Sequence, residues 1–345
     1  MINGFQNRSY QKALKVVDDT SRNAVLLQKV GRSFIFKCDW DASLVNLNKC
    51  LNVYRQFLSN SSTASTLYAL GVCLHMMNDH QQALLTFTEC RREMKKVITE
   101  DRLKLGHLHL WAGQQFFRLE EHLKASKRFT SALRIYKENR CNVEEGIIVE
   151  TLHLLGQVHV ENKQLHLALK CFDEEVLLFE STTALHSNVK ISEAYYCAGI
   201  VNVETGNDER AKKCFEKSSE VLNVGSGEES ERLAKSLEQL GALHTKEHNL
   251  TEAISLLTQA HRMYENVLGS SHTSIAISAF KLGHALNADG QFQQAKKYYV
   301  QCLQIRVNLL TSDHEDIATT HFFLGRNAFS LSEMKEAIDS LQKVS

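Results

Sequence analysis

The sequence contains no proline, although an average usage of about 5% would give a chain of 345 residues roughly seventeen. Proline removes a backbone donor and clashes with the preceding helical turn, so long uninterrupted helices tolerate its absence best. Long apolar runs are also lacking. No stretch approaches the ~20 apolar residues of a membrane-spanning helix, and residues 1–10 hold no run typical of a signal peptide.

The chain also lacks a net charge and closely paired cysteines. Lys+Arg 40 and Asp+Glu 40 give a formal net charge of +0, so no global field attracts nucleic acid or an anionic membrane. We therefore expect neither as a partner. The nine cysteines include no CxxC pair, and Cys50, Cys90 and Cys302 fall at helix-core positions that suit a small apolar side chain. They indicate reduced thiols in a cytoplasmic protein.

What the sequence does contain is an internal repeat marked by glycine. Successive repeat glycines are separated by 40, 42, 43, 43, 42, 42 and 42 residues. They are Gly31, Gly71, Gly113, Gly156, Gly199, Gly241, Gly283 and Gly325. A small residue follows each glycine after twelve positions: Ser43, Ala83, Ala125, Ala168, Ala211, Ala253, Ala295 and Ala337. Four positions further stands a large apolar residue: Leu47, Phe87, Phe129, Phe172, Phe215, Leu257, Tyr299 and Leu341.

This pattern predicts helical hairpins. Two helices, A and B, approach closely only where both carry little side chain, and the glycine and the small residue mark that crossing. Polar turn segments such as residues 78–80, 205–208 and 288–291 separate the two helices. A single hairpin cannot bury its own apolar face, so neighbouring hairpins must stack.

Small residues twelve apart, followed by an aromatic residue four later, resemble the tetratricopeptide repeat over nearly the whole chain. The period near 42 is longer than the usual 34. Residues 264–272, YENVLGSSH, look like the long repeats of kinesin light chains and nephrocystin-3, although Thr273 and Glu315 stand where those repeats carry proline. The resemblance implies an all-α fold, a right-handed α-solenoid (superhelix) of antiparallel helix A/helix B hairpins.

We expect one array over residues 1–345. Residues 1–20 are predicted to form a lone helix B, with Tyr10, Ala13, Leu14 and Val17 on its apolar face. The predicted repeats are 21–61, 62–102, 103–145, 146–188, 189–230, 231–272 and 273–314, with a truncated repeat at 315–345. Only eight residues follow Ala337, so the last helix B is short, and we expect the sequence to be part of a longer chain.

No motif predicts an active site, a metal site or a cofactor. His244-Thr245-Lys246-Glu247-His248 fits the HxxEH pattern of zinc peptidases, but His244 falls at a packing position of the repeat and His248 in the turn between helices. The segment 225–230, GSGEES, lacks the Lys-Ser/Thr of a phosphate-binding loop and carries acidic residues. We therefore expect a protein that is not an enzyme.

The resemblance implies that helix A lines a concave groove, with the residues three before and one and four after the glycine facing inward. We expect a peptide or a helix of another protein to bind there, because aromatic and arginine side chains anchor such interfaces and Gln, Asn and His bond to an extended backbone. An equally simple reading is that part of this stripe packs against the neighbouring repeat. The predicted binding residues are Tyr68, His75, Leu110, Gln114, Phe117, His153, Gln157, Tyr196, Phe280, His284, Asn287, Phe322 and Arg326.

The leading functional hypothesis is a scaffold or adaptor that binds other proteins. Two alternatives stay open. The first alternative is a regulatory or sensor repeat arm of a larger multidomain signalling protein. The second, more remote, is a zinc hydrolase that uses His244 and His248. The sequence does not identify the partner or the oligomeric state.

Overall fold

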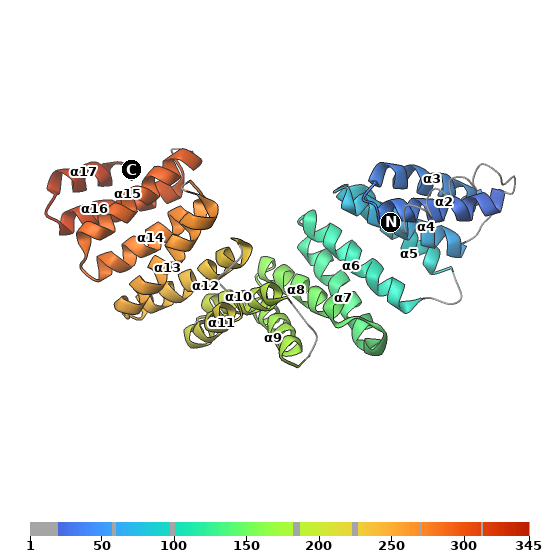
Figure 1. The fold of residues 1–345 in the computed structure, drawn as a ribbon, viewed down its shortest axis with the longest axis horizontal. Coiled ribbons are helices and arrows are strands. Elements are labelled where there is room, and N and C mark those ends of the chain that lie inside the picture. The colour runs from blue at the N-terminus through green and yellow to red at the C-terminus, as the bar shows by residue number, and fades with distance from the viewer. Residues whose placement is uncertain are drawn as a thin grey trace. The chain divides into compact units, whose positions relative to one another are not determined.

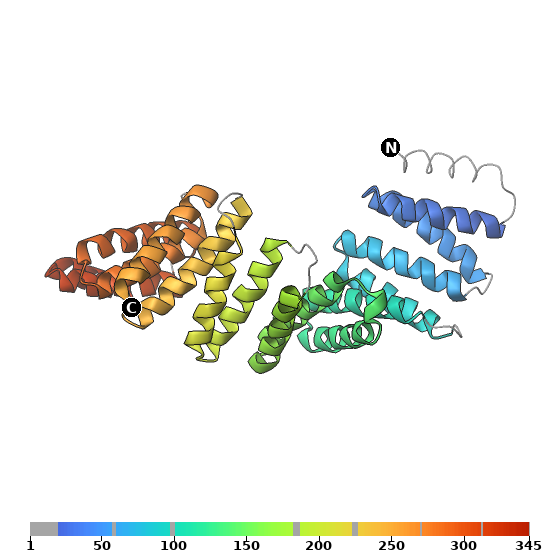
Figure 2. The same cartoon turned by 60° about the horizontal axis from the view of Figure 1, so that its bottom comes forward.

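A computed structural model describes residues 20–56, 60–96, 101–181, 187–222, 227–269, 271–311 and 313–344. Every regular element in those ranges is helical (Figures 1 and 2), which confirms the predicted all-α fold. The lone helix predicted for residues 1–20 lies outside the described residues, apart from Thr20. The chain divides into two compact units, residues 1–174 and 175–345, and the boundary falls within one helix.

The helices alternate as A and B, as the glycine register predicts. The A helices carry the repeat glycines and are α2 (Thr20–Ile35), α4 (Asn60–Met76), α6 (Arg102–Arg118), α8 (Glu145–Glu161), α10 (Asn188–Glu204), α12 (Gly227–Lys246), α14 (Thr273–Ala288) and α16 (Glu315–Ser330). The B helices are α3 (Trp40–Gln56), α5 (His80–Met94), α7 (His122–Glu138), α9 (Leu165–Ser181), α11 (Asp208–Glu220), α13 (Leu250–Leu268), α15 (Phe292–Leu309) and α17 (Met334–Gln342). A short 3-10 helix, Arg140–Asn142, follows α7.

Within each unit the hairpins stack in chain order. In the first unit α2 packs on α3, α4 on α5 and α6 on α7, while each B helix also packs on the next A helix. The second unit repeats this arrangement from α10 to α17. Neighbouring A helices also contact one another directly, as α4 contacts α6 and α12 contacts α14. Within each unit, we call the surface formed by the A-helix residues three before and one and four after each glycine the A wall of that unit.

The repeat glycines allow the large apolar residue of helix B to lie against the backbone of helix A. A Cβ atom built on Gly71 would lie 2.4 Å from Cε1 of Phe87, and one on Gly199 would lie 2.6 Å from Cε1 of Phe215. Both rings are completely buried. In the first repeat the small residue also contributes a hydrogen bond, because Ser43 Oγ donates to the carbonyl of Gly31 at 2.9 Å. The predicted A/B crossing is confirmed.

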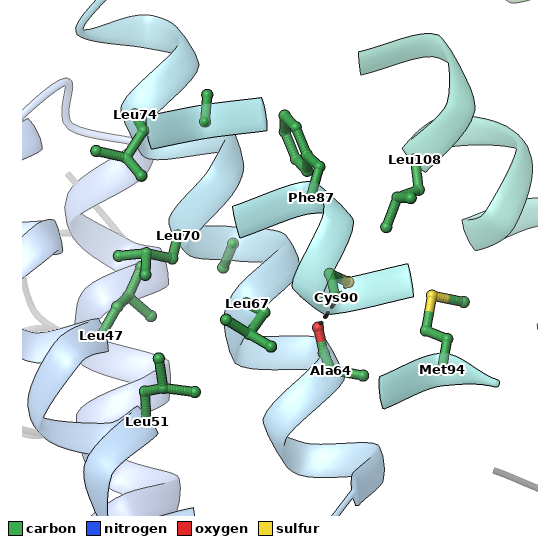
Figure 3. Close-up of a cluster of buried hydrophobic side chains, with 12 residues drawn as sticks. Leu47, Leu51, Ala64, Leu67, Leu70, Leu74, Phe87, Cys90, Met94 and Leu108 are labelled. Atoms are coloured by element: carbon green, nitrogen blue, oxygen red, sulfur yellow. Dashed lines mark hydrogen bonds between the residues drawn. The ribbon is translucent and has the colours of Figure 1, made fainter. Parts of the chain in front are cut away.

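In the first unit one buried apolar cluster extends from α3 to α6, across three successive hairpins. Figure 3 shows leucines of α3 and α4 lying beside the side chains of α5 and α6. Cys90 occupies the space of a small apolar residue and donates its thiol to the carbonyl of Ala64 at 3.2 Å. The cluster includes Leu47, Leu51, Leu67, Leu70, Leu74, Phe87, Met94 and Leu108. The apolar face of each of these hairpins is therefore buried against its neighbour.

Every A-to-B turn uses the same backbone geometry. In the second repeat the N–H of Asn78 donates to the carbonyl of His75 and that of Asp79 to the carbonyl of Leu74, both at 3.0 Å. This is a Schellman motif, which satisfies the last carbonyls of helix A and requires a left-handed residue seven positions after the glycine. Those residues are Cys38, Asn78, Glu120, Lys163, Gly206, His248, Gly290 and Ser332. Only two of the eight are glycine, so most turns carry a side chain in a costly conformation.

We expect Gly199→Leu to lower the free energy of unfolding by about 3 kcal/mol, because the new side chain overlaps the buried ring of Phe215. Urea denaturation followed by circular dichroism measures the change. The matched control is Gly146→Ala, where nothing lies within 4 Å of the added Cβ, and there we expect no loss. Equal stability of Gly199→Leu and the wild type would contradict the A/B crossing.

The turns generate a second prediction with opposite signs at two equivalent positions. Lys163→Gly should raise the free energy of unfolding by about 0.5 kcal/mol, because relief of the left-handed conformation exceeds the added chain entropy. Gly206→Ala, at a φ of 77°, should lower it by about 1 kcal/mol. The same denaturation experiment tests both variants. Changes in the free energy of unfolding that have the same sign would contradict the left-handed conformation of this turn position.

Candidate functional site

The A wall is accessible in both units. The residues at its three positions are half-buried or exposed in nearly every described repeat. Leu110 and Glu238 are the exceptions, with exposed fractions of 6% and 5%. The structure thus corrects the expectation for Leu110: its apolar side chain is buried in the packing of α6 and adds almost nothing to an accessible surface.

In the first unit, Tyr68 and His75 of α4 are tied to α6. Trp111 donates its indole N–H to the hydroxyl of Tyr68 at 3.1 Å, and its ring lies edge-on to that of His75 at 4.8 Å. Fully buried Gln115 bridges two histidines, with Nε2 2.6 Å from His75 Nδ1 and Oε1 2.9 Å from His80 Nδ1. Burial raises the pKa of the Tyr68 hydroxyl and lowers that of the His75 imidazole. Both side chains are therefore neutral and partly committed to packing.

A hollow of about 660 Å³ opens beside Tyr68, between α2, α4 and the start of α6. Its apolar lining includes Ile35, Val72 and Phe36, the last of which is 80% exposed. Arg32 stands at its edge and is fixed there, since Nη2 donates to Ser65 Oγ at 2.6 Å. This part of the A wall offers apolar surface bordered by a cation.

The remaining predicted residues of the first unit lie on α6 and α8 and are half-buried. Gln114 Nε2 donates to Glu150 Oε1 at 3.2 Å, from one A helix to the next. Phe117 lies edge-on to His122 at 5.7 Å. His153 and Gln157 lie one turn apart, 3.0 Å between Nε2 of each. Gln114, His153 and Gln157 form the polar part of the A wall in this unit.

In the second unit, Tyr196 of α10 packs on the buried ring of Phe215 at 5.6 Å, and burial raises the pKa of its hydroxyl. Further along, Lys281 of α14 reaches back to buried Glu238 of α12, with Nζ to Oε1 at 2.7 Å. A hollow of about 390 Å³ borders this ion pair. It is lined by Ala242, Thr245, Lys246, Phe280, Lys281 and His284.

Aromatic and cationic side chains concentrate on α14 and α16. We call Phe280, His284, Phe322, Phe323 and Arg326 the aromatic cluster. The ring of Phe323 lies 5.2 Å from Phe280, 5.5 Å from His284 and 5.5 Å from Phe322. The guanidinium of Arg326 lies 5.8 Å from the ring of Phe322, which is 41% exposed. Burial lowers the pKa of His284, with nearby Arg326 adding to the effect.

The cluster is extended by residues one turn further along the same helices. Asn287 Oδ1 accepts a hydrogen bond from Nδ2 of buried Asn327 at 2.9 Å, which links α14 to α16. Phe329 is 63% exposed at the end of α16. The structure thus brings the predicted residues Phe280, His284, Asn287, Phe322 and Arg326 onto one surface of the second unit.

Sequence reasoning missed the residues two before and two after the glycine, which hold adjacent A helices together. Trp111 bonds to Tyr68 and Lys281 to Glu238 across 43 positions. Gln115 approaches His75 across 40 positions, the separation that also joins Asn327 to Asn287. These spacings are one repeat plus one and one repeat minus two, so comparing chemically complementary side chains at those two offsets is the signal that would find them.

The HxxEH residues are not arranged as one helix face. Helix α12 ends at Lys246, and His248 lies in the turn with a φ of 60°. Glu247 is engaged by Lys212, with Nζ to Oε1 at 2.8 Å, and His244 Nδ1 lies 3.3 Å from Nδ2 of Asn249. Residues 225 and 226 of the GSGEES segment lie outside the described residues.

Among the described helices, none is both long enough and apolar enough to cross a membrane.

Known proteins agree with this architecture. A solved structure of the apo form of the quorum sensor NprR from B. thuringiensis is 17% identical, with a TM-score of 0.60 over 98% of this chain and 90% of that one. A putative kinesin light chain from Podosopora anserina with nearly identical TPR-like repeats is 22% identical over 59% of this chain and 95% of that chain, at a TM-score of 0.49. The likeness to NprR is one of fold.

A curated protein, the RxLR effector protein SFI4 of Phytophthora infestans, is 23% identical over 239 residues. The match spans 64% of this chain and 66% of that protein, just under two thirds of its length. The family model of the tetratricopeptide repeat matches residues 21–96, 190–266, 232–306 and 274–345. Those segments make up more than half of the sequence and hold the same hairpin register, so the chain belongs to the tetratricopeptide repeat family.

Proposed function

We propose that the chain is a non-enzymatic scaffold or adaptor of the cytoplasm whose A wall binds a peptide or a helical segment of another protein. The tetratricopeptide repeat fold is typical of protein-interaction scaffolds, and that much follows from the family. The finer proposal rests on one observation, the accessible aromatic cluster of α14 and α16.

The aromatic cluster has the composition of an interface anchor. Aromatic and arginine side chains are enriched at protein interfaces, where a few well-packed, desolvated residues contribute most of the binding energy. Phe322 and Phe329 together expose apolar surface on one helix, and Arg326 lies between them in the sequence. A bound segment with an apolar side chain and a nearby carboxylate would complement this surface.

Hydrogen-bonding groups border the aromatic surface. Residue His284 is exposed although its ring packs partly against Phe323, and Asn287 is half-buried, so both can contact an extended backbone. Neighbouring Lys246 is exposed but paired with Asp208, at 2.5 Å between Nζ and Oδ2. The arrangement supports a guest that combines apolar contacts with a few directed hydrogen bonds.

The experiment is a quantitative pull-down from lysate in which the wild type is compared with Phe322→Ala/Arg326→Ala/Phe329→Ala. These side chains are exposed, so their removal should leave the fold intact, whereas Tyr68, Tyr196 and Phe280 also pack between repeats. We expect specific proteins to be retained by the wild type and reduced about tenfold or more by the variant, the loss of one or two anchors.

The matched control replaces exposed apolar residues of B helices, Val307→Ala/Ile338→Ala, which are 55% and 56% exposed. It should retain the same proteins as the wild type, and circular dichroism should show all three proteins folded. If the α16 variant and the control lose the same partners, or neither loses any, binding does not use the A-wall side chains of α16.

A further inference from the structure

A second hollow, of about 420 Å³, lies between α5, α6 and α7 of the first unit and uses none of the A-wall positions. Its apolar lining comes from Leu105 and Phe116 of α6 and from Ile135 of α7. We call it the cationic hollow because of the side chains that surround it. They are Arg91 from α5 and Lys124, Lys127, Arg128 and Arg134 from α7.

The cations of α7 line one stretch of a single helix. At a rise of 1.5 Å per residue, Lys124 and Arg134 are separated by ~15 Å along the axis. Lys124 and Arg128 are positioned over the ring of Phe116, at 5.6 and 5.9 Å from its centre. These cation–π contacts hold two of the charged groups over the apolar lining.

Few acids compensate these charges. Glu121 pairs with Lys124, and Glu138 lies 4.0 Å from Arg134. Within the described ranges no carboxylate pairs with Arg91, Lys127 or Arg128. Elsewhere cations are multiply paired, as Lys296 is with Glu333 and Glu336 at 2.6 and 2.5 Å. In a chain of zero net charge, the hollow is a local excess of positive charge.

A buried histidine lines the same hollow. His109 of α6 is only 6% exposed, and its Nδ1 atom has no hydrogen-bond partner. Burial, together with nearby Arg128, Arg91 and Arg134, lowers its pKa to about 4. The imidazole is therefore neutral at pH 7, and one of its nitrogens carries a proton that it can donate. An unsatisfied buried polar atom is unusual and calls for a partner.

We propose that the cationic hollow binds a soluble oligophosphate, an anion with two or more linked phosphate groups. At neutral pH most phosphate oxygens are ionised acceptors, which matches a lining of guanidinium and ammonium donors and the N–H of His109. Arginine suits this role because its planar fork bonds two oxygens of one phosphate. The ~15 Å row of cations exceeds what a single phosphate contacts, so linked phosphates use it more fully.

The like charges of the free protein provide a second reason. Arg91, Arg128 and Arg134 line the same hollow, and burial together with the charge of Arg91 lowers the pKa of the Arg128 guanidinium. Binding an anion relieves that repulsion. A nucleic acid would also supply phosphates, but the other faces of this chain mix charges of both signs, and the row is short. We therefore assign the site to a small ligand and make the nucleic acid an outcome of the test.

The test is isothermal titration of the full chain with tripolyphosphate, with inorganic phosphate, and with a single-stranded oligonucleotide, at low and high salt. We expect one tripolyphosphate per chain, bound about tenfold or more tightly than inorganic phosphate and weakened by salt. Arg91→Gln/Arg128→Gln should weaken tripolyphosphate binding at least tenfold. Arg92→Gln/Lys137→Gln removes the same charge from the same helices outside the hollow and should change it less than about twofold.

A thermal melt without ligand separates this effect from unfolding. The Arg91→Gln/Arg128→Gln variant should melt close to the wild type, because the relieved repulsion offsets the lost contact of Arg128 with the ring of Phe116. Should that variant unfold, exposed Lys127→Gln provides the measurement, with an expected weakening of about threefold. Equal tripolyphosphate binding by wild type and hollow variants overturns the proposal. Tighter binding of the oligonucleotide than of tripolyphosphate also overturns it.

Discussion

The close approach of helix A and helix B at the repeat glycine is the constraint on which the rest of the structure depends. A Cβ atom at Gly71 or Gly156 would lie within 2.6 Å of a buried ring, so any larger residue there must separate the helices. The same crossing fixes the rotation of helix A, because the side chains that flank the glycine can no longer face helix B. Those side chains form the A wall. The accessible surface is therefore a consequence of the packing inside each hairpin.

The A wall has two roles that share residues. Tyr68 and Phe280 stand three before the glycine, where a ligand could reach them, yet each also contacts a side chain two before the next glycine. Buried Glu238 is the extreme case, since its carboxylate is taken up by Lys281. Contacts between stacked hairpins thus bury part of the A wall. The exposed side chains of α16, Phe322 and Phe329, keep apolar area accessible and dominate the proposed interface.

The fold could be predicted because the register of one repeat is local in sequence. Twelve residues separate Gly199 from Ala211, and the hairpin geometry alone converts that spacing into a contact. The turn position of His248 followed from the same register. The contacts between repeats were harder to predict from the sequence, because they join positions such as Asn287 and Asn327 that only the stacked structure brings together. The burial of Leu110 could not be foreseen, because nothing in the repeat pattern distinguishes it from Tyr68.

Charge shows the same limit of sequence reasoning. A total of zero excludes a global field, but a solenoid distributes its charges along a line, and the sum conceals local excess. Many ion pairs among the described residues join side chains near one repeat apart, as Lys212 and Glu247 do. Arg91 and Arg128 are likewise 37 positions apart, but both are cations. Stacking of the hairpins therefore brings like charges together here, whereas in other repeats it brings opposite charges together. A repeat protein retains such a conflict at little cost in folding specificity, since each hairpin contacts only its neighbours.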